Sequence, residues 1–271
     1  MQALFTAAKI TLSLSFLIYA SWSDYKTREV SNRVWAVYAP IAAILSLADF
    51  LIYEPSRLPL FGLSFGVTAA IALVLFYSGG FGGADSKALM CIALALPFST
   101  EALITPLLPN GVSPLAQNLF PLTIFSNAVL FAAASCIYLL LYNLAWHKKT
   151  GRKIFEGTLA KESAIKKLVA LITGRRVSIS QLKEKWHVYP MEDVEDENGE
   201  NPPKRKLVLV PKDEGRSEIV TRLSNAVDAG KIDSYVWATP GLPMLIFVTV
   251  GLVVALLFGD IVWVLINAVL G

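Results

Sequence analysis

Two aspartates stand at the ends of long apolar runs and could act as an acid–base pair. Asp24 closes the first apolar run, and Asp85 follows the glycine-rich segment 78–83 and opens another run. A charged group at the edge of a bilayer core is energetically costly and is commonly functional. Two carboxyl groups held close together share one proton, so one acts as a base and the other as an acid. Such a pair could activate water against a peptide carbonyl and protonate the departing nitrogen, with no metal or cofactor.

The residues around Asp85 have the properties of an active-site loop. Glycine tolerates positive φ, and the missing Cβ lets a substrate backbone approach closely. We expect Asp85 to lie in the first turn of a helix, where the macrodipole favours its anionic form. Lys87 is expected to be an interfacial anchor. The predicted loop consists of Gly82, Gly83, Ala84 and Lys87.

Each aspartate also has a purely structural interpretation. Asp85 could cap a helix that follows a flexible linker, and Asp24 could be an ordinary charge at a helix end. The glycines alone could suggest phosphate binding, but the Gly-Lys-Ser/Thr ending of a phosphate loop is missing. The case for chemistry therefore depends on whether the chain brings the two acids together.

The composition is that of a polytopic membrane protein. Of 271 residues, 55% are hydrophobic and 17% charged, and the mean hydropathy is +0.55. Soluble domains contain about 25% charged residues. We predict six transmembrane helices, each able to cross a core about 30 Å thick. Their approximate ranges are 3–23, 34–52, 59–78, 86–108, 122–146 and 241–268.

The first and fourth of these runs need comment. The first lacks a basic segment before it and exceeds the length of a signal-peptide core, so we expect a retained span. Prolines interrupt the fourth, and its helix is predicted to run from Asp85 to about Ser99, with a proline-rich loop on to Pro121.

The loop charges predict the topology. Basic residues lie in segments 24–33 and 79–87 and in the region after Trp146, whereas the alternate loops contain only Arg57. The positive-inside rule then makes the first set cytoplasmic and both termini extracytoplasmic. Because the chain crosses the membrane twice between them, Asp24 and Asp85 are predicted to lie at the same, cytoplasmic, face.

A polar region lies between the fifth and sixth predicted spans. We divide the chain into a membrane domain (1–146) with five helices and both aspartates, a small α+β cytoplasmic domain (147–240), and the sixth helix (241–271). The polar region holds 18 of the 24 Lys and Arg residues. We predict that a basic amphipathic helix at 156–173 lies along the membrane surface. Strands are predicted at 186–190, 206–211 and 235–238, with an acidic solvated turn at 192–203 around Asn198-Gly199. A second helix is predicted at 217–229, and it stops at Gly230.

The remaining polar groups receive structural interpretations. Asp49 and Asp260 are read as ordinary interfacial charges at the opposite face, and Cys91 and Cys136 as small buried residues. The basic run 204–206 is read as a solvated or lipid-facing patch rather than a nucleic-acid site.

Segments 24–32 (Asp-Tyr-Lys-Thr-Arg-Glu-Val-Ser-Asn) and 82–87 (Gly-Gly-Ala-Asp-Ser-Lys) resemble the two active-site segments of the type IV prepilin peptidase family, in particular its archaeal preflagellin and prepilin peptidases. The resemblance extends to the predicted spans and to segment 237–240. It implies a multi-pass aspartic endopeptidase of the cell membrane, with Asp24 and Asp85 as the catalytic pair and no cofactor. The implied partners are archaellin or pilin-like precursors with short basic leader peptides.

The chain departs from the family pattern in two places, and other functions stay open. The common Gly-x-Gly-Asp reads Gly82-Gly83-Ala84-Asp85, and the cysteine-rich region that accompanies N-methyltransferase activity is missing, so that activity is not expected. One alternative is an intramembrane protease of the presenilin or signal peptide peptidase type, although the Pro-Ala-Leu motif is lacking. A second alternative is a transporter or assembly scaffold without enzymatic activity.

Overall fold

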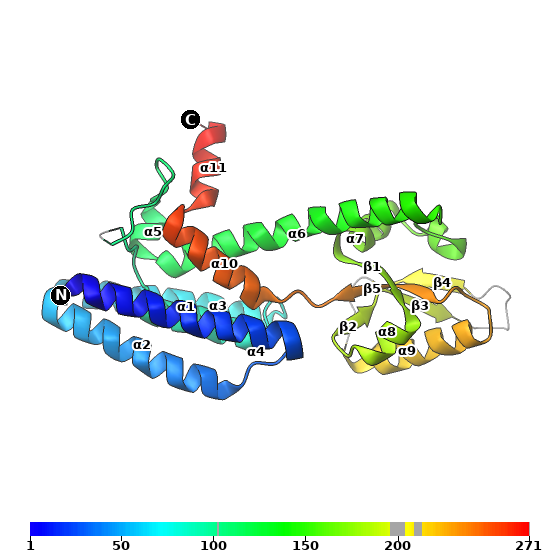
Figure 1. Ribbon diagram of the computed structural model, residues 1–271, viewed down its shortest axis with the longest axis horizontal. Helices are drawn as coiled ribbons and strands as arrows, with labels where there is room; N and C mark the ends of the chain where they lie inside the picture. The colour runs from blue at the N-terminus through cyan, green and yellow to red at the C-terminus, as the bar shows by residue number, and fades with distance from the viewer. Residues whose placement is uncertain (102, 196–203, 209–212, 271) are drawn as a thin grey trace. The chain divides into compact units, whose positions relative to one another are not determined.

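The computed structural model describes residues 1–101, 103–195, 204–208 and 213–270. Its contacts divide the chain into a helical unit, residues 1–132 and 243–271, and a second unit, residues 133–242. Helix α6 (Phe120–Thr150) contributes residues to both. The other helices of the first unit are α1 (Gln2–Thr27), α2 (Asn32–Tyr53), the short η1 (Pro55–Arg57), α3 (Leu58–Tyr77), α4 (Gly83–Ala95), α5 (Pro114–Asn118), α10 (Met244–Leu257) and α11 (Ile261–Leu270) (Figure 1).

Among the described residues, four helical segments are long and apolar enough to cross a membrane, so the chain is a multi-pass membrane protein. They are α1, α2, η1 with α3, and α6. Helices α10 and α11 form a fifth span if they are counted together across their 64° bend. Helix α4 has 13 residues, which makes it about 20 Å long and shorter than a bilayer core. The count of six spans therefore stays a prediction.

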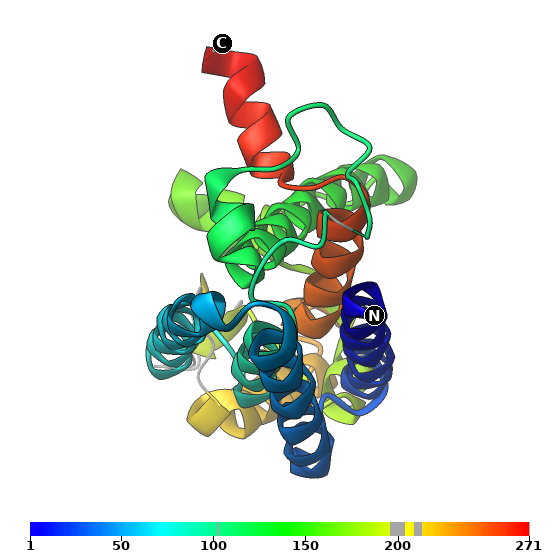
Figure 2. The ribbon, with the colours of Figure 1, turned by 90° about the vertical axis from the view of Figure 1, so that its left-hand side faces the viewer.

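Helix α4 occupies the centre of the first unit. It packs against α1, α2, α3 and α10, and Figure 2, which looks along the bundle, shows it enclosed by these helices. Seven of its residues are buried, among them Ala88, Ala93, Ala95 and Cys91, which confirms the prediction for that cysteine. Small side chains let the neighbouring backbones approach closely. More than half of the helix is buried in spite of its short length.

The end of α4 explains why the predicted helix was too long. The helix stops at Ala95, before Pro97, because proline disfavours helical geometry in the residue that precedes it. Serine hydroxyls of neighbouring helices donate to carbonyls at and after the end of α4. Ser46 Oγ donates to the Leu94 carbonyl at 2.6 Å, and Ser64 Oγ donates to the Pro97 carbonyl at 3.2 Å. Backbone groups in an apolar environment need such partners.

Two acids assigned to the interface are buried instead. Asp49 of α2 is 4% exposed and forms an ion pair with Lys9 of α1 at 2.7 Å. Asp260, between α10 and α11, is also buried and accepts a hydrogen bond from Ser113 Oγ at 2.6 Å. Their interpretation as ordinary interfacial charges is wrong, because each carboxylate has a partner from a distant part of the chain that compensates burial.

The second unit is built on a small antiparallel sheet, with a two-stranded hairpin beside it. The sheet has the order β1-β5-β2, and β3 pairs with β4. The elements after α6 are η2 (Gly157–Lys161), α7 (Ala164–Thr173), β1 (Arg175–Ser178), α8 (Ile179–Glu184), β2 (Val188–Pro190), β3 (Glu192–Glu195), β4 (Lys204–Leu207), α9 (Asp213–Asp228) and β5 (Tyr235–Pro240).

Strand β5 joins two small cores through the alternation of its side chains. Val236 and Ala238 pack with residues of α8 and α9, whereas Trp237 packs on the other face with Leu159 of η2 and Ala170 of α7. Successive side chains of a strand point to opposite faces of the sheet. Helices therefore cover both sides of this strand.

Several local predictions for the second unit are confirmed. Strands lie at β2 and β5, and α9 covers most of the predicted helix and is followed by Gly230 with φ +67°. The predicted helix at 156–173 is interrupted, since Ser163 caps α7 by accepting the Lys166 N–H. The expected turn at Asn198-Gly199 lies outside the described residues. Strand β1 and helix α8 were not predicted.

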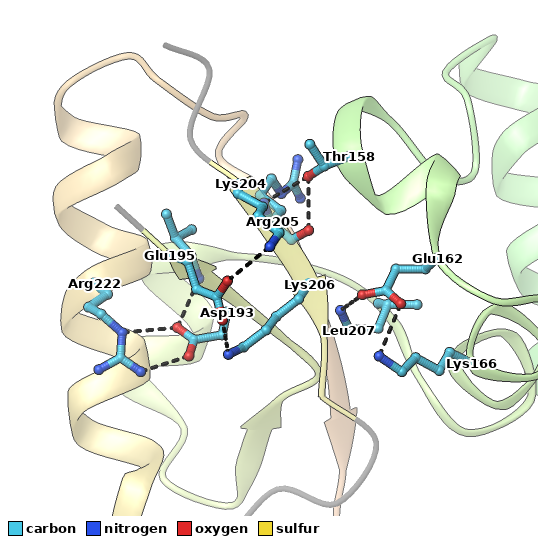
Figure 3. Close-up of polar contacts among 11 residues, drawn as sticks. Thr158, Glu162, Lys166, Asp193, Glu195, Lys204, Arg205, Lys206, Leu207 and Arg222 are labelled. Carbon is cyan, nitrogen blue, oxygen red and sulfur yellow. Dashed lines mark hydrogen bonds and ion pairs between the residues drawn. The ribbon is translucent and has the colours of Figure 1, made fainter. Parts of the chain in front are cut away.

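The acidic segment 192–195 is a buried strand and not a solvated turn, so that prediction is wrong there. Glu192 is fully buried, and Arg205 Nη2 of β4 donates to its two carboxylate oxygens at 2.7 and 2.8 Å. Asp193 accepts two hydrogen bonds from Arg222 of α9 (Figure 3). The basic run 204–206 is correspondingly not a free patch, because Arg205 is buried and its two neighbouring lysines pair with Glu195.

The Glu192–Arg205 pair leads to a prediction for the free energy of unfolding. Burial raises the pKa of the Glu192 carboxyl, and the nearby guanidinium groups of Arg205 and Arg176 oppose this change. We expect Arg205→Met to leave a buried charge without its main partner and to cost about 3–5 kcal/mol of folding stability. Thermal unfolding of the full chain, followed by tryptophan fluorescence, measures the loss.

Lys204→Met is the matched control, because the Lys204 side chain is 65% exposed, and it should leave the unfolding temperature nearly unchanged. The double variant Arg205→Met/Glu192→Met should be more stable than Arg205→Met alone. An Arg205→Met protein that unfolds at the wild-type temperature contradicts the assigned role of the pair.

Candidate active site

Asp24 lies one turn before the end of α1. The helix ends where Arg28 adopts the left-handed conformation (φ +57°) and donates its backbone N–H to the Asp24 carbonyl at 3.0 Å. The turn that follows is held by two hydroxyl groups, since Ser23 Oγ and Thr27 Oγ1 both donate to the Glu29 carbonyl, at 2.8 and 3.0 Å. The end of α1 that carries Asp24 is thus fixed by local hydrogen bonds.

Asp85 lies in the first turn of α4, as predicted. Gly82 is the N-cap of the helix, and its backbone N–H donates to Asp85 Oδ2 at 3.0 Å. A carboxylate in the first turn of a helix is favoured both by this hydrogen bond and by the macrodipole. Ser86 Oγ donates to the Ala72 carbonyl of α3 at 3.2 Å and joins this turn to the neighbouring helix.

The glycines of the loop have different roles. Gly79 has φ +77°, which satisfies the expectation of a left-handed backbone. Gly82 has an ordinary φ of −72°, but a Cβ there would lie 3.0 Å from Asp85 Oδ2. A Cβ on Gly83 would make only an ordinary contact, at 3.6 Å from Phe76. A side chain at position 82 would therefore press on the Asp85 carboxylate and shift it.

The structure brings the two predicted aspartates to the same end of the helical unit. Helices α1 and α4 pack against each other, and Figure 1 shows the end of α1 and the start of α4 side by side at one end of the bundle. Both carboxylates are half-buried, and they are close enough for their negative charges to repel each other. The Arg28 guanidinium interacts favourably with Asp24. The two carboxyl groups therefore interact electrostatically across the contact between α1 and α4.

Two residues of the site were not singled out in the sequence. Arg28 is the nearby cation, and Asn32, at the start of α2, accepts a hydrogen bond from Lys87 Nζ at 2.7 Å. Lys87 is exposed and joins the start of α4 to the start of α2. Arg28 follows Asp24 by one helical turn, and this spacing could have indicated Arg28 as the cation near Asp24.

A cavity of about 640 Å³ lies in the same unit but is lined by the residues around Lys9 and Asp49 and not by the aspartate pair. Four of its charged groups form ion pairs, Lys9 with Asp49 and Arg57 with Glu54, and Glu101 accepts a hydrogen bond from Ser99 Oγ at 2.8 Å. Within the described ranges, no group of three or more His, Cys, Asp or Glu side chains could hold a metal ion. We therefore place the candidate active site at Asp24 and Asp85.

Comparison with known proteins identifies the family of this chain. The model of the type IV leader peptidase family matches residues 11–144, and that of the archaeal peptidase A24 C-terminus, type II, matches residues 166–261. The chain belongs to the type IV leader peptidase family. It is therefore a peptidase, and the first match contains both Asp24 and Asp85.

Two preflagellin peptidases are similar to this chain over most of their length. The preflagellin peptidase of Methanococcus voltae is 25% identical over 261 residues, which cover 92% of this chain and 94% of the relative. The preflagellin peptidase of Methanococcus maripaludis is 24% identical over 255 residues, or 90% of this chain and 92% of the relative. The similarity includes the second unit as well as the helical one.

The contact between Gly82 and Asp85 leads to a prediction for peptidase activity. In Gly82→Ala the new methyl group displaces the Asp85 carboxylate by a few tenths of an ångström, and we expect kcat/KM to fall roughly tenfold, because catalysis depends steeply on position. Cleavage of a leader-bearing precursor by the reconstituted enzyme measures this fall.

Gly66→Ala, in the middle of α3, is the control, since a Cβ there meets open space, and it should retain full activity. Equal activity of Gly82→Ala and the wild type would show that the carboxylate position does not depend on this glycine.

Proposed function

We propose that this protein is a membrane aspartic endopeptidase that removes short basic leader peptides from archaellin or pilin-like precursors at the cytoplasmic face of the cell membrane. The observation that carries the proposal is the packing of α1 against α4, which leaves Asp24 near enough to Asp85 for its negative charge to act on that carboxyl group. The family membership and the preflagellin peptidases among the relatives support the same reaction.

The charges around the pair support the cytoplasmic location. Lys26 and Arg28 lie at the end of α1, Arg33 at the start of α2 and Lys87 at the start of α4. Arg57, in the segment between α2 and α3, is neutralised by Glu54 at 2.8 Å. The excess of positive charge thus accompanies the aspartates, and the positive-inside rule assigns that end to the cytoplasm. With six crossings, both termini lie outside.

The proposed mechanism needs only water and the two carboxyl groups. The ionised carboxylate takes a proton from a water molecule, whose oxygen attacks the carbonyl carbon of the scissile bond. The protonated carboxyl then gives its proton to the amide nitrogen as the carbon–nitrogen bond breaks. The products are a leader peptide with a new carboxyl end and a subunit with a free amine. The pair finishes the cycle with one proton, as it began.

The geometry of α4 suits an extended substrate that enters from the membrane surface. Gly82 and Gly83 place bare backbone next to Asp85, where a substrate chain can approach without meeting side chains. In the family that the chain resembles, cleavage takes place just before the hydrophobic helix of the subunit. That helix can stay in the bilayer while the basic leader lies in the cytoplasm.

Substitution of either aspartate tests the catalytic pair. Asp24→Asn and Asp85→Asn each remove a group that must accept or donate a proton, so each should lower cleavage of a basic-leader precursor by about 10²- to 10⁴-fold. The double variant should be no worse than the poorer single variant, because the two groups act as a unit. Mass spectrometry of the precursor after incubation with the reconstituted enzyme measures cleavage.

Glu29→Gln is the matched control, since it exchanges an exposed carboxyl for an amide in the same segment as Asp24. It should process the precursor normally. Undiminished cleavage by Asp24→Asn or Asp85→Asn would refute the pair and would mean that other residues of the chain carry the catalysis.

A further inference from the structure

Helix α7 carries an apolar stripe that the described residues of its own unit leave largely uncovered. Ile165 and Leu168 are 74% and 54% exposed, and the half-buried Ile172 continues the stripe at helical spacing. The opposite face holds the helix in the unit: Ala170 is fully buried in the core around Trp237. The exposed stripe is therefore additional to what folding of the second unit requires.

The segment that carries the stripe is basic. Lys161, Lys166 and Lys167 lie in or just before α7, and the acidic residue among them, Glu162, is already occupied. Its carboxylate accepts the Leu207 N–H at 3.0 Å and binds Lys166 at 3.0 Å, as Figure 3 shows. An apolar stripe flanked by lysines has the composition of a helix that lies in the interface of a bilayer with anionic lipids.

Two hydrogen bonds attach α7 to α6. Asn143 of α6 is buried and donates to the carbonyls of Leu171 and Gly174, at 2.8 and 2.7 Å. Both carbonyls belong to the end of α7 and the residue that follows it. The short helix is thus hydrogen-bonded to one particular turn of a membrane-spanning helix.

That turn lies where α6 leaves the apolar core. Helix α6 has 31 residues, about 46 Å, whereas the core is about 30 Å thick. Its exposed Tyr138 and Tyr142 stand one turn apart, and the next turns carry Trp146 and then Lys148 and Lys149. Tyrosine and tryptophan gather at the level of the lipid headgroups. Asn143 lies among them.

We propose that α7 is an interfacial anchor, whose Ile165–Leu168–Ile172 stripe enters the leaflet at the end of α6 while the neighbouring lysines bind anionic headgroups. The anchor fixes the second unit against the membrane surface. The proposal depends on α6 as a membrane span and does not depend on the roles of Asp24 and Asp85.

Site-specific fluorescence in the full-length protein tests the anchor. In a Cys91→Ala/Cys136→Ser background, an NBD probe on Leu168→Cys is reconstituted in nanodiscs that contain anionic lipid and lipid with a nitroxide just below the headgroup. We expect strong quenching at position 168 and weak quenching at Thr221→Cys, a matched exposed position on α9. Equal quenching at the two positions would overturn the proposal, as would disulfide cross-linking of position 168 between copies in place of quenching.

Two further measurements test the apolar stripe and the neighbouring lysines separately. Ile165→Glu/Leu168→Glu changes only exposed side chains, so the unfolding temperature in detergent should be unchanged while quenching of a probe on Ile172→Cys is lost. Exchange of the anionic lipid for a zwitterionic one should weaken quenching at position 168. Quenching that persists in the glutamate variant contradicts insertion of the stripe, and equal quenching in the two lipid mixtures contradicts binding of anionic headgroups by the lysines.

Discussion

The enclosure of the short helix α4 by its neighbours is the constraint on which the site depends. Alanines and other small residues let α1, α2, α3 and α10 approach it from all sides. The packed helix has little freedom to slide or rotate, because close-packed interiors do not deform gradually. Its first turn, and with it Asp85, therefore has a defined position relative to the end of α1. A catalytic pair with one member on each helix needs this rigidity.

The aspartates of the helical unit lie in two kinds of environment. Asp49 and Asp260 are nine-tenths or more buried, and each has a partner, Lys9 for one and Ser113 for the other. Asp24 and Asp85 are half-buried and face another carboxylate. The first arrangement compensates the cost of burial, whereas the second makes ionisation of both groups unfavourable. The difference lies in the partner and not in the type of residue.

In the second unit the charged groups mostly stabilise the fold. Glu192 and Asp193 are adjacent in β3, yet they bind arginines of two different elements, β4 and α9. From composition alone this segment looks solvated, because acidic residues close to an Asn-Gly pair are typical of turns. The partners come from distant positions and meet only when the hairpin and α9 pack together. Charge by itself gives no information on which residues will be covered.

The sequence by itself determined the membrane class, the approximate positions of most helices, the strands at 188–190 and 235–238, and the placement of Asp85 in the first turn of a helix. These features follow from apolar run length, strand alternation and helix-start signals, which are local properties. Only the tertiary structure decided that α4 is central and that Asp49, Asp260 and Glu192 are buried. These depend on which distant segments pack together, and burial, pairing and steric room are properties of the packed chain.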